Sequence, residues 1–430
     1  MQVSTPEAPK IERKTASNPV KAEAGWPPAV IAGAYYTGVL LMRNLEQRGV
    51  RAYCFDTNPA QPGFKSVYGK TFLCPNPDED AAGWLSFMVR LAKDIGEKPI
   101  LIPAADQFVT AIAENVRELE KHFIFHSFAA AIQALLATKR RQYELAQAHG
   151  LTIPRSEMIH SREELKHFAS QVQFPCVMKP LHCREWERLP QYHPLRDKKL
   201  AVAASAEDLL GRYESVAAFT GEVVAQEIIE GPDTAKVVYL SCYSRTGERL
   251  GSCMVREIRT GPINFGSASV VEPCADPETD ELCDRFLKNI GYAGLCELEL
   301  KRDSRDGKVK LIEVNPRYSG TSDAAPYAGV DIGWLHYLDL AGVEVAPVEQ
   351  QQNDFRHICL QRDFSTLRSY RKAGLLSWRE LLRSYRPPLH FYDFDARDWR
   401  ISLATLVELF KIVFGPSIRR VFPKRRPAHS

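Results

Sequence analysis

The stretch CELELKRDSRDGKVKLIEVNPR, residues 296–317, constrains the fold more than any other part of this chain. Apolar and polar residues alternate on both sides of a polar turn that ends in Asp306 and Gly307, which predicts an antiparallel hairpin. Pro316 cannot donate a hydrogen bond to a central ladder, so we expect the second strand to end there. The hairpin therefore places a defined set of side chains on each face of a sheet.

One face of the second strand carries oxygen-bearing side chains. Side chains alternate along a strand, so Glu313 and Asn315 point to one face while Val314 points to the other. Arg317 follows the proline and is expected at the mouth of the polar surface. Unpaired polar groups are costly to bury, so this pattern predicts a site. The alternative is a pair of strand residues that form structural ion pairs.

Residues 27–127 show a strand, helix, strand order that predicts a small parallel sheet. PAVIAGA, RAYCFD and PILIPA are short apolar runs, GVLLMRNLEQRG and FVTAIAENVRELEKH are helical, and FIFHS is a further short strand. GAYYTG lies where a dinucleotide fingerprint would lie, with Asp56 at the end of the second strand. Its central glycine is replaced by tyrosine, so the turn gives only weak support for NAD binding.

The middle of the chain predicts further strands around a hinge. The helical stretch AAAIQALLATKRRQYELAQAHGLTIPRS stops at Gly150 and Pro154, and a strand in QFPCVMKPLHC then places Lys179 among apolar neighbours. The following strand leads into EGPD, which is a candidate boundary between two lobes, and a hairpin turns at residues 245–247.

Composition limits the class of protein. A chain of 430 residues exceeds what one core usually serves, so we expect two or three domains or lobes. A net charge of +3 lacks the basic excess of a nucleic-acid-binding protein. Ten cysteines without a CxxC pair predict reduced thiols and a cytoplasmic location. Residues 1–25 predict a disordered tail without a secretory signal, and no apolar run is long enough to span a bilayer.

Several spaced motifs occur together in an order that resembles the ATP-grasp superfamily, which holds ATP between two α+β lobes. The motifs are LATKRRQYELAQAHGLTIP, PCVMKP, AQEIIEGPD, GYAGLCELEL and LIEVNPRYSG, and they span about residues 130–342. The patterns around PAADQFV, Trp186 and NFG are similar to the carboxylate-amine ligase branch that includes D-aspartate ligases. The implied fold is mixed α/β and α+β. A parallel-sheet domain (27–127) precedes the ATP-grasp domain (128–345, hinge near 226–233), and a partly helical C-terminal region (346–430) follows.

The resemblance also implies which residues bind ATP. Lys179 and Lys139 would contact the phosphates, where a flexible ammonium suits a moving negative charge. Backbone groups around Glu227 and Ile229 would contact adenine, Asp233 would bind the ribose, and Gln226 would lie nearby. A solvated surface lysine is the alternative for Lys139, and an ordinary acidic loop is the alternative for Asp233.

Mg²⁺ or Mn²⁺ is the implied metal, with Glu299, Glu313 and Asn315 as ligands, since hard cations take oxygen ligands. Glu297 shares the strand face of Glu299, so the choice between them comes from the resemblance alone. Arg317 would grip a phosphate or the substrate carboxylate through its two-pronged geometry.

The loop that would cover the phosphates and the residues that would hold the substrate are less clear from the sequence pattern. Many ATP-grasp enzymes carry a glycine-rich loop after the Lys179 position, but the chain continues PLHCREWERLPQYHPLRDKKL without a glycine. Basic residues of this segment are candidates to cover the phosphates instead: Arg184, Arg188, Arg196, Lys198 and Lys199. The alternative is that the segment is a lid that serves a different substrate. Arg256 and Arg259 are each candidates to hold an anionic substrate, and the two face one side of the strand only if a bulge lies between them. A charged strand surface is the alternative.

The implied reaction uses ATP to phosphorylate a carboxylate, and an amine then attacks the acyl phosphate. Small-molecule acid and amine substrates are the expected partners, and a homo-oligomer is left open. One alternative is a nucleotide-binding regulatory or scaffold protein that has lost turnover. Another is a carboxylase or carbamoyl-phosphate-type enzyme that uses bicarbonate.

The C-terminal region predicts a terminal helix. In ISLATLVELFKIVFG the apolar residues 403, 406, 407, 410, 413 and 414 follow helical spacing, so we expect this face to pack against the protein. The basic tail RRVFPKRRP offers a weak attraction for an anionic membrane, but a short basic tail is usually solvated.

Overall fold

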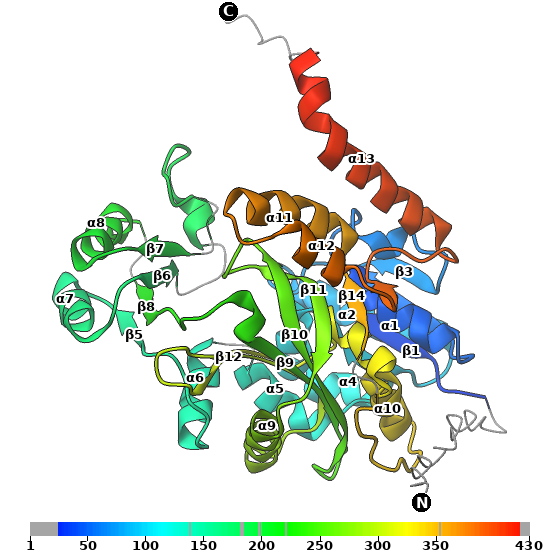
Figure 1. Ribbon diagram of the computed structural model, residues 1–430. Helices are drawn as coiled ribbons and strands as arrows, with labels where there is room; N and C mark the ends of the chain where they lie inside the picture. Colours follow the sequence, from blue (N-terminus) through cyan, green and yellow to red (C-terminus); the bar gives the residue numbers. More distant parts are fainter. Residues whose placement is uncertain are drawn as a thin grey trace, which may run out of the picture.

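The computed structural model describes residues 25–136, 139–180, 185–196, 198, 200–219, 222–351 and 354–421 (Figure 1). Nearly all of the predicted N-terminal tail, the basic residues Arg184 and Lys199, and residues 422–430 lie outside this part of the chain. Three sheets organise the described residues: a parallel sheet of four strands, a sheet of seven strands and an antiparallel sheet of four strands. The mixed α/β class predicted from the sequence is confirmed.

The N-terminal sheet has the order β3-β2-β1-β4, and every pair in it is parallel. Its strands are β1 (Ala29–Ala32), β2 (Ala52–Asp56), β3 (Lys70–Leu73) and β4 (Ile100–Pro103), and its helices are α1 (Tyr36–Glu46), α2 (Ala81–Ile95), α3 (Asp106–Glu114) and α4 (Val116–His122). The expected FIFHS strand is reduced to a single bridge between Ile100 and Ile124. The expected helix over FVTAIAENVRELEKH is broken at Asn115 into α3 and α4.

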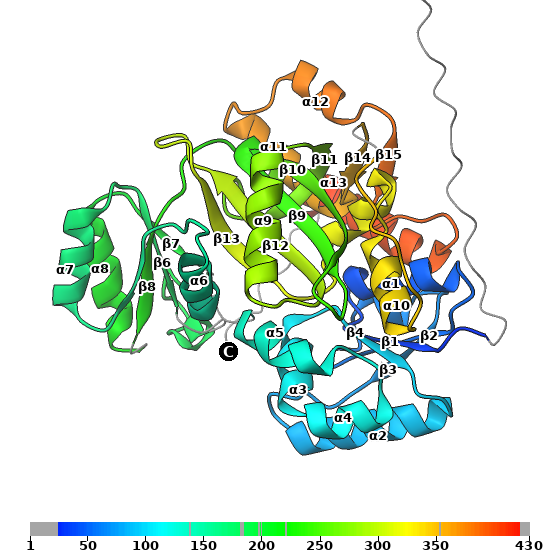
Figure 2. The same ribbon diagram turned by 90° about the horizontal axis from the view of Figure 1, so that it is seen from below.

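The seven-stranded sheet is the centre of the molecule (Figure 2). Its order is β13-β12-β9-β10-β11-β14-β15, with β9 (Lys236–Tyr243), β10 (Arg249–Gly261), β11 (Ser267–Cys274), β12 (Gly294–Arg302), β13 (Val309–Asn315), β14 (Arg356–Ile358) and β15 (Leu389–Phe391). Both predicted hairpins, β9–β10 and β12–β13, are present as antiparallel pairs. Strand β13 ends at Asn315, directly before the proline, as expected.

The two faces of this sheet bury different side chains. On the first face, Leu240 and Val255 join a core that includes Ile31 of the N-terminal sheet. On the second face, Leu298 and Val314 pack in a core with residues of three helices: α5 (Ala130–Leu136), α6 (Lys139–Ala148) and α9 (Pro277–Asn289). Because side chains alternate along a strand, the odd-numbered residues of β12 lie on the first face, which is turned toward the N-terminal sheet. Asn315 is paired with Glu297 and lies on the same face.

The small antiparallel sheet forms a separate lobe with its own core. Its order is β5-β8-β6-β7, with β5 (Ser156–Ile159), β6 (Cys176–Pro180), β7 (Ala201–Ala203) and β8 (Val223–Glu227), and it is accompanied by α7 (Arg162–Gln171) and α8 (Ala206–Ala217). Trp186, within the 3₁₀ turn Glu185–Arg188, is buried in this core. A connector of residues 228–235, with the 3₁₀ turn Asp233–Ala235, joins β8 to β9 of the large sheet.

The C-terminal region continues the large sheet and adds helices. After α10 (Ile332–Leu340) it contains β14, α11 (Leu360–Lys372), α12 (Trp378–Ser384), β15 and α13 (Trp399–Val421). Arg259 of β10 is fully buried and forms two hydrogen bonds of 2.9 Å with the carboxylate of Asp363 on α11. This buried pair ties the C-terminal helices to the central sheet.

The terminal helix corrects one expectation. The predicted apolar face does not pack against the described protein, because Leu403, Leu406 and Val407 are 54, 50 and 45% exposed. Helix α13 is docked through a different face, on which Ile401 and Thr405 are buried. The side chains at positions 413 and 414 lie outside the described part of the structure.

Candidate functional site

Two carboxylates face each other across neighbouring strands on the first face of the large sheet. Glu299 of β12 is paired directly with Glu313 of β13. Like charges directly opposite one another destabilise a sheet unless a cation compensates them. Lys139 Nζ lies 2.9 Å from Glu313, and Lys236 Nζ lies 3.4 Å from Glu299 and 2.9 Å from Glu257. The fold therefore supplies one lysine to each carboxylate.

Lys179, the other lysine predicted to contact the phosphates, comes from the small lobe. Lys179 Nζ on β6 donates to Gln226 on β8 at 2.8 Å, and Gln226 donates to the Tyr143 hydroxyl of α6 at 3.0 Å. Burial, together with the nearby charge of Lys139, lowers the pKa of Lys179 to about 8, and Glu313 offsets only part of this. Burial also disfavours the charged form of Lys139, but the neighbouring Glu313 carboxylate outweighs burial and raises the pKa of Lys139. Two ammonium groups so close together favour an anion between them.

Asn315 connects the polar face to the mouth of the site. Its amide nitrogen donates to Glu297 at 2.9 Å, and its oxygen accepts from Arg317 at 2.9 Å. Ser319 donates to the other oxygen of Glu297 at 2.5 Å. Burial, reinforced by the charge of Glu299, raises the pKa of Glu297 to about 7. Glu297 is thus a supporting group that orients Asn315, whereas Glu299 is the one placed opposite Glu313.

Arg317 lies between the large sheet and the N-terminal domain. Its guanidinium forms two hydrogen bonds with Asp106 at the start of α3, of 2.6 and 2.9 Å. Burial opposes its charge, but Asp106 outweighs burial and raises the pKa of Arg317. The Arg317 guanidinium was predicted to bind a phosphate or the substrate carboxylate through two hydrogen bonds, but in the structure it makes these two bonds with Asp106. An acidic substrate would have to compete with Asp106 or bind beside it.

Glu227 at the end of β8 and Ile229 of the connector, the two residues predicted to contact adenine, differ in their backbone hydrogen bonding. The Glu227 N–H donates to the Arg155 carbonyl at 2.9 Å, and its carboxylate accepts from Lys310 at 3.0 Å. Ile229 is buried, and neither of its backbone polar groups has a protein partner within the described residues. A backbone N–H and carbonyl that lie outside a strand and lack protein partners can form hydrogen bonds with the edge of a heterocycle.

Asp233 is already engaged by the protein. Its carboxylate accepts from the Thr260 hydroxyl at 2.9 Å and the Asn264 N–H at 3.1 Å, and the Tyr370 hydroxyl contacts it as well. The residue thus joins the connector to β10 and α11. Its ribose contact stays a prediction that would require one of these bonds to be exchanged.

Arg256 is not brought to the carboxylates. It is paired with Val237 and Glu272, and Val237 lines the core of the second face, opposite to Glu299. Its guanidinium donates to Glu272 at 2.5 Å. The ladder is irregular on either side of Arg259, as a bulge would require, but Arg259 is buried against Asp363. Neither arginine lies with the predicted metal ligands.

The donor set fits a hard divalent cation that keeps other ligands. Among the described residues, no group of three or more His, Cys, Asp or Glu side chains is arranged to hold a metal ion alone. Glu299 and Glu313 supply two carboxylates, and Mg²⁺ commonly completes its shell with water and substrate phosphates. Lys139 and Lys236 form ion pairs with Glu313 and Glu299, which indicates that this position favours positive charge.

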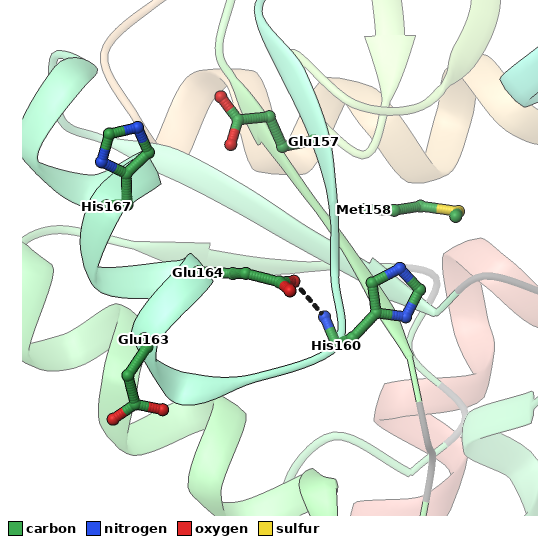
Figure 3. Close-up of a pocket in the computed structure, with 6 residues that line it drawn as sticks. All are labelled: Glu157, Met158, His160, Glu163, Glu164 and His167. Carbon is green, nitrogen blue, oxygen red and sulfur yellow. Dashed lines mark hydrogen bonds between the residues drawn. The ribbon is translucent and has the colours of Figure 1, made fainter.

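A separate pocket opens on the small lobe, between β5 and α7. Figure 3 shows its lining side chains, with the His160 N–H donating to Glu164 at 2.8 Å. Its volume is about 620 Å³, and it is lined by Glu157, Met158, His160, Glu163, Glu164 and His167. None of the predicted site residues lines it, so it is distinct from the carboxylate face.

Sequence reasoning missed three residues of this site. Lys236, Glu257 and Asp106 were not assigned roles, although Asp106 lies in the PAADQFV pattern. Lys236 begins an apolar strand, which is the same signal that singled out Lys179. Glu257 sits where alternation along β10 predicts the polar face, and burial raises its pKa to about 7 despite Lys236.

Parts of this chain are similar to known ATP-grasp proteins. A family model described as ATP-grasp in the biosynthetic pathway with Ter operon matches residues 253–361. D-aspartate ligase of Enterococcus faecium (strain Aus0004) is 26% identical over 275 residues, which cover 60% of this chain and 63% of the ligase. The chain thus spans less than two thirds of that relative.

Solved structures match over most of the chain. The ADP complex of N5-carboxyaminoimidazole ribonucleotide synthetase has a TM-score of 0.59 at 14% identity and covers 81% of this chain and 86% of its own. The biotin carboxylase domain of Hydrogenobacter thermophilus 2-oxoglutarate carboxylase, solved with MgADP, ADP and bicarbonate, has a TM-score of 0.55 at 18% identity, covering 76 and 73%. At these identities the likeness establishes the fold.

Proposed function

From the ATP-grasp fold of this chain, we propose that it is an ATP-dependent ligase that joins a carboxylate to an amine and releases ADP and phosphate. The observation that carries the proposal is the opposed pair Glu299 and Glu313, each compensated by a lysine, with Lys179 of the small lobe beside them. The similarity to D-aspartate ligase supports the choice of an amine as the second substrate.

Lys139 and Lys179 would hold the phosphates of ATP. The two come from different parts of the ATP-grasp region, α6 and β6, so binding between them draws these elements around the nucleotide. The free backbone groups of Ile229 would hold the adenine edge. Positioning and charge neutralisation account for most catalysis in phosphoryl transfer, so no nucleophilic side chain is required.

A divalent cation held by Glu299, Glu313 and Asn315 would neutralise charge that develops on the phosphates. Lys139 and Lys236 form ion pairs with these carboxylates and offset the repulsion between them. Hydrogen bonds with Glu297 on one side and Arg317 on the other fix the orientation of the Asn315 amide, which supports this proposed role.

The reaction proceeds in two steps. A carboxylate oxygen of the acid attacks the γ-phosphorus, the bond to the β–γ bridging oxygen breaks, and ADP leaves. The amine nitrogen then attacks the acyl carbon and loses a proton, and the bond from that carbon to the phosphate oxygen breaks. Arg317 would hold the acid or the transferred phosphate once its hydrogen bonds with Asp106 were exchanged.

Hydroxylamine trapping tests the proposal. With ATP, Mg²⁺ and a panel of acids, hydroxylamine should intercept the acyl phosphate and give a hydroxamate, with ADP as the nucleotide product. Lys179→Ala should suppress both products, since the phosphates lose a central cation. Lys166→Ala, which removes an exposed lysine of α7 in the same lobe, is the matched control and should retain them.

Three other outcomes would each contradict the proposal. Release of AMP and pyrophosphate would indicate an adenylate. ADP formation driven by bicarbonate alone would indicate a carboxylase, which the likeness to a biotin carboxylase domain makes the second candidate. Tight ATP binding without ADP across a broad panel of acids and amines would favour a regulatory protein.

A further inference from the structure

An apolar stripe runs along the exposed side of α13. Trp399, Leu403, Leu406, Val407 and Phe410 follow i, i+4, i+7, i+8 and i+11 spacing, and each is 45 to 58% exposed. Five large apolar side chains on one helix face exceed the scattered apolar residues that an ordinary surface carries. Packing within the described structure does not account for the apolar character of this face.

The helix is held to the protein from another side. Thr405 donates to the Asp393 carbonyl at 2.6 Å and accepts from Gln361 at 3.1 Å, and Ile401 is buried beside them. This anchoring fixes which face of α13 turns outward. Beyond its first turns the helix extends away from the body of the molecule, as Figure 1 shows.

Charge is distributed unevenly along the chain. Residues 364–430 contain 14 lysines and arginines and five acidic residues, a net charge of +9, whereas the whole chain is +3. The first 363 residues are therefore net −6. Arg400 and Lys411 are exposed on α13 itself, and Lys424, Arg425 and Arg426 follow its last residue in the sequence. Basic charge thus accompanies the apolar stripe.

We propose that α13 docks the protein on an anionic lipid surface, with the stripe inserted at the headgroup boundary and Arg400 and Lys411 facing the headgroups. An interfacial helix combines Trp, Phe and Leu on one face with Lys and Arg around it, as this one does. Basic residues near a membrane add attraction to anionic lipids. The helix binds in the plane of the surface, since none of the described helices is long and apolar enough to cross a bilayer.

A second copy of this chain fits the stripe less well. A symmetric contact between two copies would use the same patch on both, so the basic residues around one stripe would meet those around the other. Like charges brought together oppose association. An anionic surface avoids this repulsion.

Vesicle flotation of the full chain tests the docking. Vesicles of phosphatidylcholine with phosphatidylglycerol should bind the protein at physiological salt, while pure phosphatidylcholine vesicles bind it more weakly. Leu403→Asp should reduce the partition coefficient by about tenfold or more, because a leucine is lost from the lipid-facing stripe and a negative charge is added. Leu73→Asp is the matched control, since Leu73 is 55% exposed on β3 and Leu403 is 54% exposed.

Vesicle binding and light scattering distinguish lipid docking from its alternatives. Full-chain protein that stays with the unbound fraction on anionic vesicles would overturn the proposal. Equal binding by Leu403→Asp and Leu73→Asp would overturn the role of α13. A dimer in light scattering that Leu403→Asp dissociates, without vesicle binding, would assign the stripe to a second copy. Raised salt should weaken vesicle binding, because it screens the attraction between the basic residues and the anionic headgroups.

Discussion

The depressed pKa of Lys179 makes ATP binding sensitive to pH in a window where few side chains titrate. Burial and the neighbouring charge of Lys139 lower this pKa to about 8. Lys179 is therefore about nine tenths protonated at pH 7 and about one tenth protonated at pH 9. If only the ammonium form binds the phosphates, the apparent Kd for ATP should rise by about tenfold between these two values.

Lys179→Arg is the control that isolates this effect. Arginine keeps its charge throughout this range, so the variant should show an ATP affinity that changes little between pH 7 and pH 9. Titration calorimetry with Mg²⁺-ATP at several pH values measures both proteins under identical ionisation of the nucleotide. The same rise in Kd for the wild type and for Lys179→Arg would refute the assignment, because another group would then be responsible.

Two further substitutions test the site and its support. Glu313→Gln should weaken Mg²⁺-dependent ATP binding while leaving thermal unfolding close to wild type, and calorimetry with wild-type Mg²⁺ dependence in this variant would contradict the metal assignment. Asp363→Asn should lower the free energy of unfolding by about 3–5 kcal/mol, because Arg259 would be left buried without its counter-charge. Glu97→Gln removes the exposed pair with Arg51 and should cost less than about 1 kcal/mol in the same denaturant experiment, and equal losses for the two variants would contradict the role of the buried pair.

The sequence by itself determined the hairpin and the face on which its carboxylates lie. Side chains of a strand alternate with a period of two, so the parity of Glu313 and Asn315 settled their common face without any knowledge of the partner strands. Pro316 settled where the strand ends, since it cannot join a ladder. Local covalent geometry is enough for conclusions of this kind.

Contacts between distant segments could not be obtained in this way. Arg317 and Asp106 are 211 positions apart, and only the packing of the N-terminal domain on the large sheet makes them partners. The face of Arg256 likewise followed from the ladder with β9 and β11. Local sequence does not encode which strands become neighbours or how lobes are oriented.

The terminal helix shows the same division. Its periodicity correctly placed Leu403, Leu406 and Val407 on one face, but periodicity does not say whether anything covers that face. Tertiary structure decided this, because Thr405 and Ile401 dock another side of the helix against the protein. An apolar stripe is recognisable from sequence, whereas its exposure depends on which of the competing faces the rest of the chain can hold by hydrogen bonds and burial.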